Sequence, residues 1–211
     1  MKYIWIQLLL LSILYATPFT EAVEQYNKGK YSQALTAFKT LAKAGNVRAQ
    51  YNVGMMYALG KGTTMHESEA LKWYEKAAKQ KHGISAYNLG QYYQAKGEKD
   101  PHAYTKAKYW YEKAIALKVG EAYNNLAILY IKGLGVPKDK HKAMELLAKA
   151  AALDNSIAQL NIGVLYAWDK EIVNDKMKAF ENLKKSLSAG QSKASNYLDR
   201  LCKESAWVCK D

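Results

Sequence analysis

The sequence predicts an all-α solenoid built from antiparallel helix pairs. Three observations lead to this prediction: a block of about 36 residues that recurs along the chain, apolar residues at helical spacing within each block, and glycine-rich turns. A period in this range is typical of a fold whose units bury their cores only against their neighbours. Such a fold usually presents surface for binding and seldom builds a catalytic pocket.

The first helix of each repeat carries small residues and a tyrosine at fixed positions. Glycine or alanine recurs as Gly54, Gly90, Ala127 and Gly163, within copies that begin at Ala49, Ser85, Ala122 and Ala158. Because glycine costs about 1 kcal/mol in a helix interior, its recurrence predicts the close approach of a neighbouring helix. We expect the tyrosines three positions later to fill the gap beside it as core residues: Tyr57, Tyr93, Tyr130 and Tyr166.

Glycine-rich turns separate the first helix from the second in two of the repeats. The segments Gly60-Lys61-Gly62 and Gly133-Leu134-Gly135 suit the positive φ angles that end a helix sharply. Neither has the spacing of a phosphate-binding loop. Pro137 and Asp139 follow the second of these turns, and both residue types favour the start of a helix.

The second helix of each repeat has one face of small and aromatic residues, with lysines mostly off that face. Spacings of three and seven place together Ala70, Trp73, Ala77; Ala107, Trp110, Ala114; Ala143, Leu146, Ala150; and Ala179, Asn182, Ser186. The positive charge is therefore expected on second helices and loops. The fourth copy lacks the glycine turn and the tryptophan, which suits the end of an array.

This pattern resembles the Sel-one-like repeat, a branch of the tetratricopeptide-repeat class. The match is nearly complete from Ala49 to Ala78, and it is almost as good from Tyr130 to Ala151. The resemblance implies a right-handed superhelical solenoid with an adaptor or scaffold role, often at or beyond the inner membrane of bacteria. The chain departs from the pattern at Asp100-Pro101-His102, where the second repeat is one residue longer, and at His66, where an acidic residue is expected.

The chain is predicted to comprise an export signal, a partial repeat, four repeats and a terminal cap. Lys2 and the apolar stretch from Ile4 to Ala16 are typical of a secretory signal, and Thr20 and Ala22 predict cleavage after Ala22. An uncleaved anchor is the alternative, although this stretch is shorter than the roughly 20 residues that span a membrane. The predicted boundaries are 1–22 for the signal peptide, 23–46 for the partial repeat, 47–83, 84–120, 121–156 and 157–190 for the repeats, and 191–211 for the capping helix and disulfide tail.

A net charge of +12 survives removal of residues 1–22, because that segment contains one lysine and one glutamate. In a periplasmic or secreted protein this charge favours an anionic neighbour such as a membrane face, a cell-wall polymer or an acidic protein. Lysines that merely solvate the outer helices would explain much of the same charge. Without a nucleic-acid recognition motif or a second apolar run, the mature chain is expected to be a soluble monomer without nucleic acid.

Cys202 and Cys209 are the two cysteines of the chain, and both lie near its end. In an oxidising compartment such a pair predicts one disulfide. Seven residues of continuous helix would hold the two Cα atoms about 10 Å apart, whereas a disulfide needs less than about 7 Å. The bond therefore requires the last helix to end near residues 203–205 and the tail to fold back.

First-helix side chains provide the candidate partner-binding residues, because repeats of the resembled class use them to line a concave groove. Here the groove is aromatic, amide-bearing and apolar, which suits a peptide or helix that docks through aromatic anchors. Core packing is the alternative for Met55 and Ile128, whereas Trp168 in its degenerate turn favours binding. The candidates are Arg48, Tyr51, Met55, Leu59, Tyr87, Gln91, Asn124, Ile128, Lys132, Leu160, Val164 and Trp168.

A column of asparagines recurs at one position of the repeat: Asn52, Asn88, Asn125 and Asn161. Stacked amides can bind a peptide backbone. A buried amide must nevertheless be satisfied, so bonds between neighbouring units are the favoured interpretation.

The sequence contains no recognisable catalytic or metal-binding constellation. His66, His82, His102 and His141 fall in turns or at helix starts, where we expect them to be exposed, and their spacing matches no metal motif. A nucleophile-elbow motif is also missing. We therefore expect no enzyme activity, cofactor or metal.

The favoured function is an exported adaptor that binds a partner protein or peptide in the groove. A periplasmic immunity or inhibitor protein against a secreted toxin is the main alternative. A cell-wall accessory protein or enzyme is a third, disfavoured because no catalytic residues are recognised.

Overall fold

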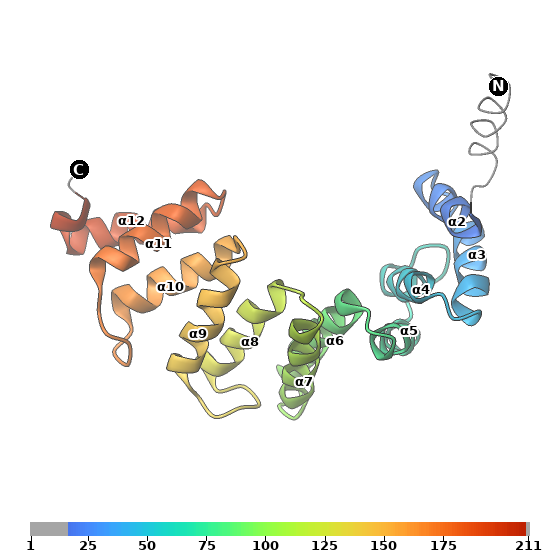
Figure 1. The fold of residues 1–211 in the computed structure, drawn as a ribbon, viewed down its shortest axis with the longest axis horizontal. Coiled ribbons are helices and arrows are strands. Elements are labelled where there is room, and N and C mark those ends of the chain that lie inside the picture. The colour runs from blue at the N-terminus through green and yellow to red at the C-terminus, as the bar shows by residue number, and fades with distance from the viewer. Residues whose placement is uncertain (1–16, 210–211) are drawn as a thin grey trace, which may run out of the picture. The chain divides into compact units, whose positions relative to one another are not determined.

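The computed structural model describes residues 17–209, which contain α-helices, one short 3-10 helix and no β-strand. Figure 1 shows the order of the helices along the chain. The described residues form two compact units that meet in sequence between Ala86 and Tyr87. The predicted all-α fold class is therefore confirmed.

The first unit is a stack in which each helix packs on the next one in sequence. Its core is built around Phe38, with Val53 and Met56 fully buried and Trp73 nearly so. The four helices that lie wholly in this unit are α2 (Pro18–Asn27), α3 (Tyr31–Lys43), α4 (Val47–Leu59) and α5 (Glu67–Lys79), and the first residues of α6 (Gly83–Gly97) also belong to it.

The second unit begins within α6 and repeats the same arrangement. Leu129 and Leu147 are fully buried in its interior, and a cluster that contains Leu183 and Leu201 closes its C-terminal end. After α6 its elements are α7 (Ala103–Ala116), α8 (Glu121–Lys132), α9 (Lys140–Ala151), α10 (Ser156–Trp168), α11 (Lys176–Ser188), α12 (Lys193–Glu204) and the 3-10 helix η1 (Ala206–Cys209).

Short polar side chains and glycines set the ends of these helices. The Asn46 side chain accepts a hydrogen bond from Ala49 N, and Asp139 accepts one from Lys142 N, so each caps a helix N-terminus. Gly60 and Gly133 adopt left-handed conformations at the C-termini of α4 and α8, as their sequence context predicts. Pro137 precedes α9 instead of lying in its first turn.

Side chains of the second helices, and not the predicted tyrosines, fill the space beside the recurring glycines. A Cβ atom on Gly54 would lie 2.8 Å from Tyr74 Cδ1, and one on Gly90 would lie 2.6 Å from Tyr111 Cδ1. Leu183 takes the same place beside Gly163. The tyrosines expected in the core, namely Tyr57, Tyr93, Tyr130 and Tyr166, are half-buried. The close helix approach was predicted correctly, but the residue that exploits it was not.

The predicted faces of the second helices are largely confirmed. Alanines at the expected positions are buried in all four copies, and Ser186 is buried in place of alanine. Its hydroxyl donates to the carbonyl of Ser156 at 2.7 Å, which satisfies the buried polar group. Trp110 differs from Trp73 because it is only half-buried.

Helix α2 begins inside the segment predicted as signal peptide. The part of that segment up to Ala16 lies outside the described residues. Thr17 caps the helix, Ala22 is fully buried, and the Phe19 ring packs edge-on against Phe38 with 5.6 Å between ring centroids. Residues 17–22 thus contribute to the core of the first unit.

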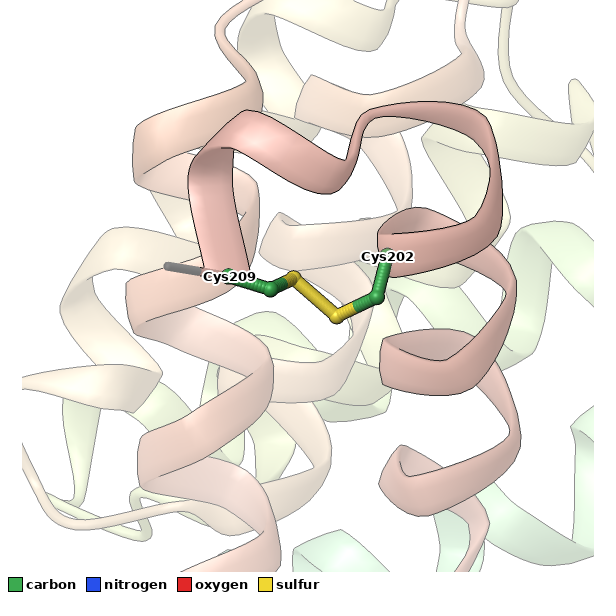
Figure 2. Close-up of a disulfide and its surroundings, with 2 residues drawn as sticks. All are labelled: Cys202 and Cys209. Atoms are coloured by element: carbon green, nitrogen blue, oxygen red, sulfur yellow. A yellow bond between two sulfur atoms is a disulfide. The ribbon is translucent and has the colours of Figure 1, made fainter. Parts of the chain in front are cut away.

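The predicted disulfide is present, and the chain meets the geometric condition predicted for it. Helix α12 ends at Glu204, and η1 turns the tail back so that the Cα atoms of Cys202 and Cys209 lie 5.7 Å apart. Figure 2 shows the bond joining the end of α12 to η1. Val208, between the two cysteines, is buried against the terminal core.

Candidate functional site

The candidate binding residues are divided between the two units. Arg48 is exposed on α4, whereas Tyr51 and Met55 are half-buried and Leu59 at the end of that helix is 56% exposed. The remaining candidates, from Tyr87 onward, belong to the second unit. Each unit therefore has its own candidate surface.

Contacts with aromatic rings hold two candidate residues of the first unit, Arg48 and Tyr51. The Tyr51 ring lies 4.9 Å from the ring of His82 and 5.9 Å from that of Tyr74, measured between centroids. The Arg48 guanidinium lies 5.2 Å from the centroid of Phe19, within the range of a cation–π interaction. Arg48 and Tyr51 thus form a surface whose side chains are already held in place.

His82 has a structural role that the sequence analysis missed. It is half-buried instead of exposed, and its Nδ1 atom accepts a hydrogen bond from the backbone N of Ser85 at 3.2 Å. This bond caps the N-terminus of α6. Burial, together with the charge of Arg48, lowers the pKa of His82. The sequence signal for this cap was a histidine three residues before the small residue Ser85 that opens the repeat.

In the second unit, three candidate residues line one pocket of about 290 Å³. Gln91 comes from α6, and Ile128 and Lys132 come from α8; Gln91 and Lys132 are exposed and Ile128 is half-buried. A Glu98 carboxylate and the Lys132 ammonium give the wall both charge signs. The full lining is Gln91, Gln94, Ala95, Glu98, Tyr104, Tyr111, Asn125, Ile128, Lys132 and Leu134.

A network of tyrosine hydroxyls and amides lies in the wall of this pocket. Tyr111 OH donates to Gln94 Oε1 at 2.8 Å and accepts from Asn125 Nδ2 at 3.3 Å. Asn125 Nδ2 also donates to Tyr87 OH at 3.2 Å, and Gln91 Nε2 donates to the same hydroxyl at 3.1 Å. Burial raises the pKa values of both tyrosines, so both hydroxyls stay protonated at neutral pH.

Two members of the asparagine column, Asn125 and Asn161, form hydrogen bonds within the protein. Asn161 Nδ2 donates to Asn124 Oδ1 at 3.0 Å, and Asn124 Nδ2 donates to Asn125 Oδ1 at 3.3 Å. These bonds join the fourth repeat to the third, and Asn125 continues the chain to Tyr87 of the second. The favoured interpretation, that asparagines of this column link neighbouring repeats, is confirmed for Asn125 and Asn161.

The pocket lining also contains Gln94, Tyr104 and Tyr111, which were not among the candidates predicted from the sequence. The recurring dipeptides Trp73-Tyr74 and Trp110-Tyr111 were a usable signal, because the residue after each tryptophan is buried beside a first-helix glycine. In the third and fourth repeats leucine occupies this column and offers no hydroxyl. This hydroxyl is therefore confined to the first two repeats, and in the second repeat Tyr111 brings it to the pocket.

Two predicted candidates, Asn124 and Leu160, are buried away from solvent. Asn124 is 4% exposed and Leu160 is 7% exposed. Val164 is half-buried and packs against the terminal core. These three residues therefore pack within the protein, and none of them lines the pocket.

Trp168 is engaged by the capping helix. Its Nε1 atom donates to Glu204 Oε2 at 2.6 Å, and the Arg200 guanidinium lies 4.5 Å from its ring centroid. Arg200 Nε also binds Glu204 Oε1 at 2.8 Å. Hydrogen bonds from Arg200 and Trp168 lower the pKa of Glu204. The residue interpreted from sequence as a binding anchor thus helps to hold α12 in place.

The degenerate turn of the fourth repeat forms ion pairs with the preceding turn. Lys140 Nζ lies 2.6 Å from Asp169 Oδ2 and 2.9 Å from Glu171 Oε1. Lys138 also pairs with Glu171 at 3.1 Å. Acidic residues here replace a glycine turn with a charged link between the third and fourth repeats.

Residues 17–209 offer neither a metal-binding cluster nor a membrane-spanning helix. Nowhere in that range do three histidine, cysteine or acidic side chains gather as a metal-binding group. None of the helices there combines the length and apolar character needed to cross a bilayer.

A comparison with protein families gives four consecutive matches. The family model described as Sel1 repeat matches residues 47–82, 83–119, 120–155 and 156–191. These matches cover most of the chain. No curated protein matches it.

Several solved structures are similar. The crystal structure of a Sel1 repeat protein from Oxalobacter formigenes is 28% identical, with a TM-score of 0.75 over 88% of this chain and 80% of that one. A structure described as the immunity protein Pa5087 from Pseudomonas aeruginosa is 22% identical, with a TM-score of 0.52 over 82% of this chain and 68% of that one. The second likeness shows the fold alone.

Proposed function

The chain belongs to the Sel1 repeat family, and on that premise we propose that it is an exported adaptor that binds a partner protein or peptide. Proteins of this family are generally protein-interaction scaffolds. The proposed site is the pocket face of the second unit, formed by α6 and α8 with Tyr104 and Tyr111 of α7.

The observation that carries this proposal is the prearranged polar wall of the pocket. Gln91 and Gln94 are held by tyrosine hydroxyls, and Lys132 lies exposed at the same pocket. Side chains that are already ordered lose less conformational entropy when a partner docks. Together with half-buried Ile128, they offer a partner both polar contacts and apolar area.

Export is supported by the disulfide between Cys202 and Cys209. Such bonds form and persist in oxidising compartments and are rare in the cytosol. We propose a periplasmic or secreted location on this basis and on the signal-like segment up to Ala16.

Site-specific photocrosslinking in the native cells tests the proposal. A photoreactive residue at Gln91 or Lys132 should give a discrete crosslinked product that mass spectrometry identifies as one partner. The same residue at Lys149, an exposed position on the second helix α9, serves as the control. Crosslinks that are equally strong from Lys149, or none from either pocket position, would contradict the proposal.

The identity of the crosslinked partner also separates the adaptor from an immunity protein. A toxin as partner, together with protection of cells that express the chain, would assign the immunity function. Tyr87 and Trp168 are unsuitable for this test, because both hold structural neighbours and their replacement would mix binding with stability.

A further inference from the structure

One chain of hydrogen bonds below the pocket of the second unit runs in a single direction. Donors run from Asn161 to Asn124, from Asn124 to Asn125, and from Asn125 to Tyr111. Tyr111 OH, which accepts from Asn125, then gives its one proton to Gln94 Oε1. At the end of this chain the Gln94 carboxamide turns its oxygen toward Tyr111 OH.

This orientation decides which groups the pocket offers to a ligand. With Gln94 Oε1 occupied by Tyr111, the Gln94 amide group presents its two N–H donors. Gln91 has the opposite arrangement, since its Nε2 atom binds Tyr87 OH and its Oε1 atom remains as an acceptor. The two residues are three positions apart on α6, so they lie on one helix face with Cβ atoms about 5–6 Å apart.

We infer that Gln94 and Gln91 form a donor–acceptor pair that binds the main chain of an extended peptide segment of the partner. The N–H and C=O groups of one extended residue point to the same side, as they do when strands pair. Gln94 would donate to that carbonyl and Gln91 would accept from that N–H. This inference rests on the proposed function and specifies the chemistry of its site.

Other ligand classes match the pocket less well. An anion needs donors alone, whereas this wall offers the Gln91 oxygen and the Glu98 carboxylate as well. A purely apolar anchor would leave the oriented amides unpaired, which costs binding energy. An N-acetylated sugar has the same amide group as a peptide, but it is less consistent with the protein-binding role of the family.

Peptides selected from a displayed random library against the full chain provide the probe. Gln94→Glu keeps the oxygen that accepts from Tyr111 OH but removes the N–H donors. Gln91→Lys keeps a donor for Tyr87 OH but removes the acceptor. Each variant should weaken binding of the selected peptide by about tenfold, which corresponds to one lost hydrogen bond. The matched control Gln33→Glu, at an exposed position on α3, should leave affinity within about twofold.

A peptide in which an ester replaces the contacted amide gives the decisive comparison. This replacement should weaken binding to the natural chain about tenfold and have little further effect in Gln91→Lys, because the partner of the missing N–H is already gone. Unchanged affinity of the ester or of the glutamine variants would overturn the inference. Failure to select a peptide, or competition for the pocket by an N-acetylated disaccharide, would also overturn it. If crosslinking from Gln91 or Lys132 still captures a partner protein, the proposed function survives each of these results.

Discussion

At the residue scale, His82 links helix capping to a candidate binding surface. Its Nδ1 atom caps α6 through Ser85 while its ring stacks on Tyr51. The charged group that faces it from α4 is Arg48, which, after burial, is the second cause of its lowered pKa. A protonated ring can no longer accept the hydrogen bond from Ser85 N. Its positive charge would also be half-buried near Arg48, so protonation destabilises the folded arrangement in both ways.

The stability of the first unit should therefore depend on pH through His82. Since folding lowers the pKa of His82 below its usual value of 6.5, its contribution is complete above that pH and is lost as the pH falls through the lowered value. His82→Asn supplies a cap that does not titrate in this range. Urea unfolding at pH 7.5 and pH 5 should show a smaller loss of stability for His82→Asn than for the natural chain. An equal loss in both proteins would contradict this role.

The absence of a side chain at Gly90 makes room for the ring of Tyr111, which lines the pocket. A Cβ atom there would overlap the Tyr111 ring, which the bonds to Gln94 and Asn125 hold in place. Gly90→Ala should lower the free energy of unfolding by about 1–2 kcal/mol, because overlap with the held ring costs about 2–3 kcal/mol, in the upper part of the usual overpacking range, and the helix-propensity gain is only about 1 kcal/mol. Adding Tyr111→Leu should restore part of the loss, since the third repeat combines Ala127 with Leu147 in the same columns. Unchanged stability of Gly90→Ala in urea unfolding would argue against this packing.

At the element scale, α12 closes the second unit through a few specific contacts. Trp168 binds Glu204, Arg200 covers the tryptophan ring, and the disulfide brings Val208 into the terminal core. In a repeat protein each unit depends mainly on its neighbours. Loss of this cap should consequently affect the end of the array first.

Replacing both cysteines by serine should loosen the C-terminal end selectively. Closing a loop of this length contributes about 2–3 kcal/mol by the chain-entropy account. Hydrogen exchange should become faster in residues 193–208 and remain unchanged in residues 47–80. Uniformly faster exchange along the chain would show that the disulfide stabilises the whole protein instead of its end.

Helix α2 provides a similar test at the other end. A recombinant chain of residues 23–211 lacks Phe19 and Ala22, whereas a chain of residues 17–211 retains them. The shorter chain should have a lower unfolding temperature, because it loses the burial of Phe19 and its ring pair with Phe38, worth about 2–3 kcal/mol together. Equal unfolding temperatures would mean that residues 17–22 add nothing to the core.

The elements were largely predictable because their determinants are local and repeated. Asn46, Asp139, Gly60 and Gly133 end helices through their own backbone and side-chain chemistry, which a sequence shows directly. Tyr111 could not be placed in the same way, because its position beside Gly90 depends on how two helices meet. The Trp168–Glu204 bond was equally hidden, since the two residues are far apart in the sequence.

At the scale of the whole molecule, the chain combines a general scaffold with a local specialisation. The family matches account for the helix pairs, while the bond between Gln94 and Tyr111 gives the second repeat its own pocket wall. We propose that the net charge of +12 also favours attachment to anionic surfaces, through exposed lysines outside the pocket. The salt dependence of binding distinguishes the two modes of attachment, because salt screens exposed charges much more than buried contacts.

The most direct measurement is the affinity of the purified crosslinked partner for the natural chain and for a Gln91→Ala/Ile128→Ala/Lys132→Ala variant. The variant should bind at least about tenfold more weakly, as expected when residues at the centre of an interface are truncated. It should retain its helical content, and the difference should persist at about 500 mM salt. Equal affinities for the variant and the natural chain would contradict the assignment of this face as the binding site.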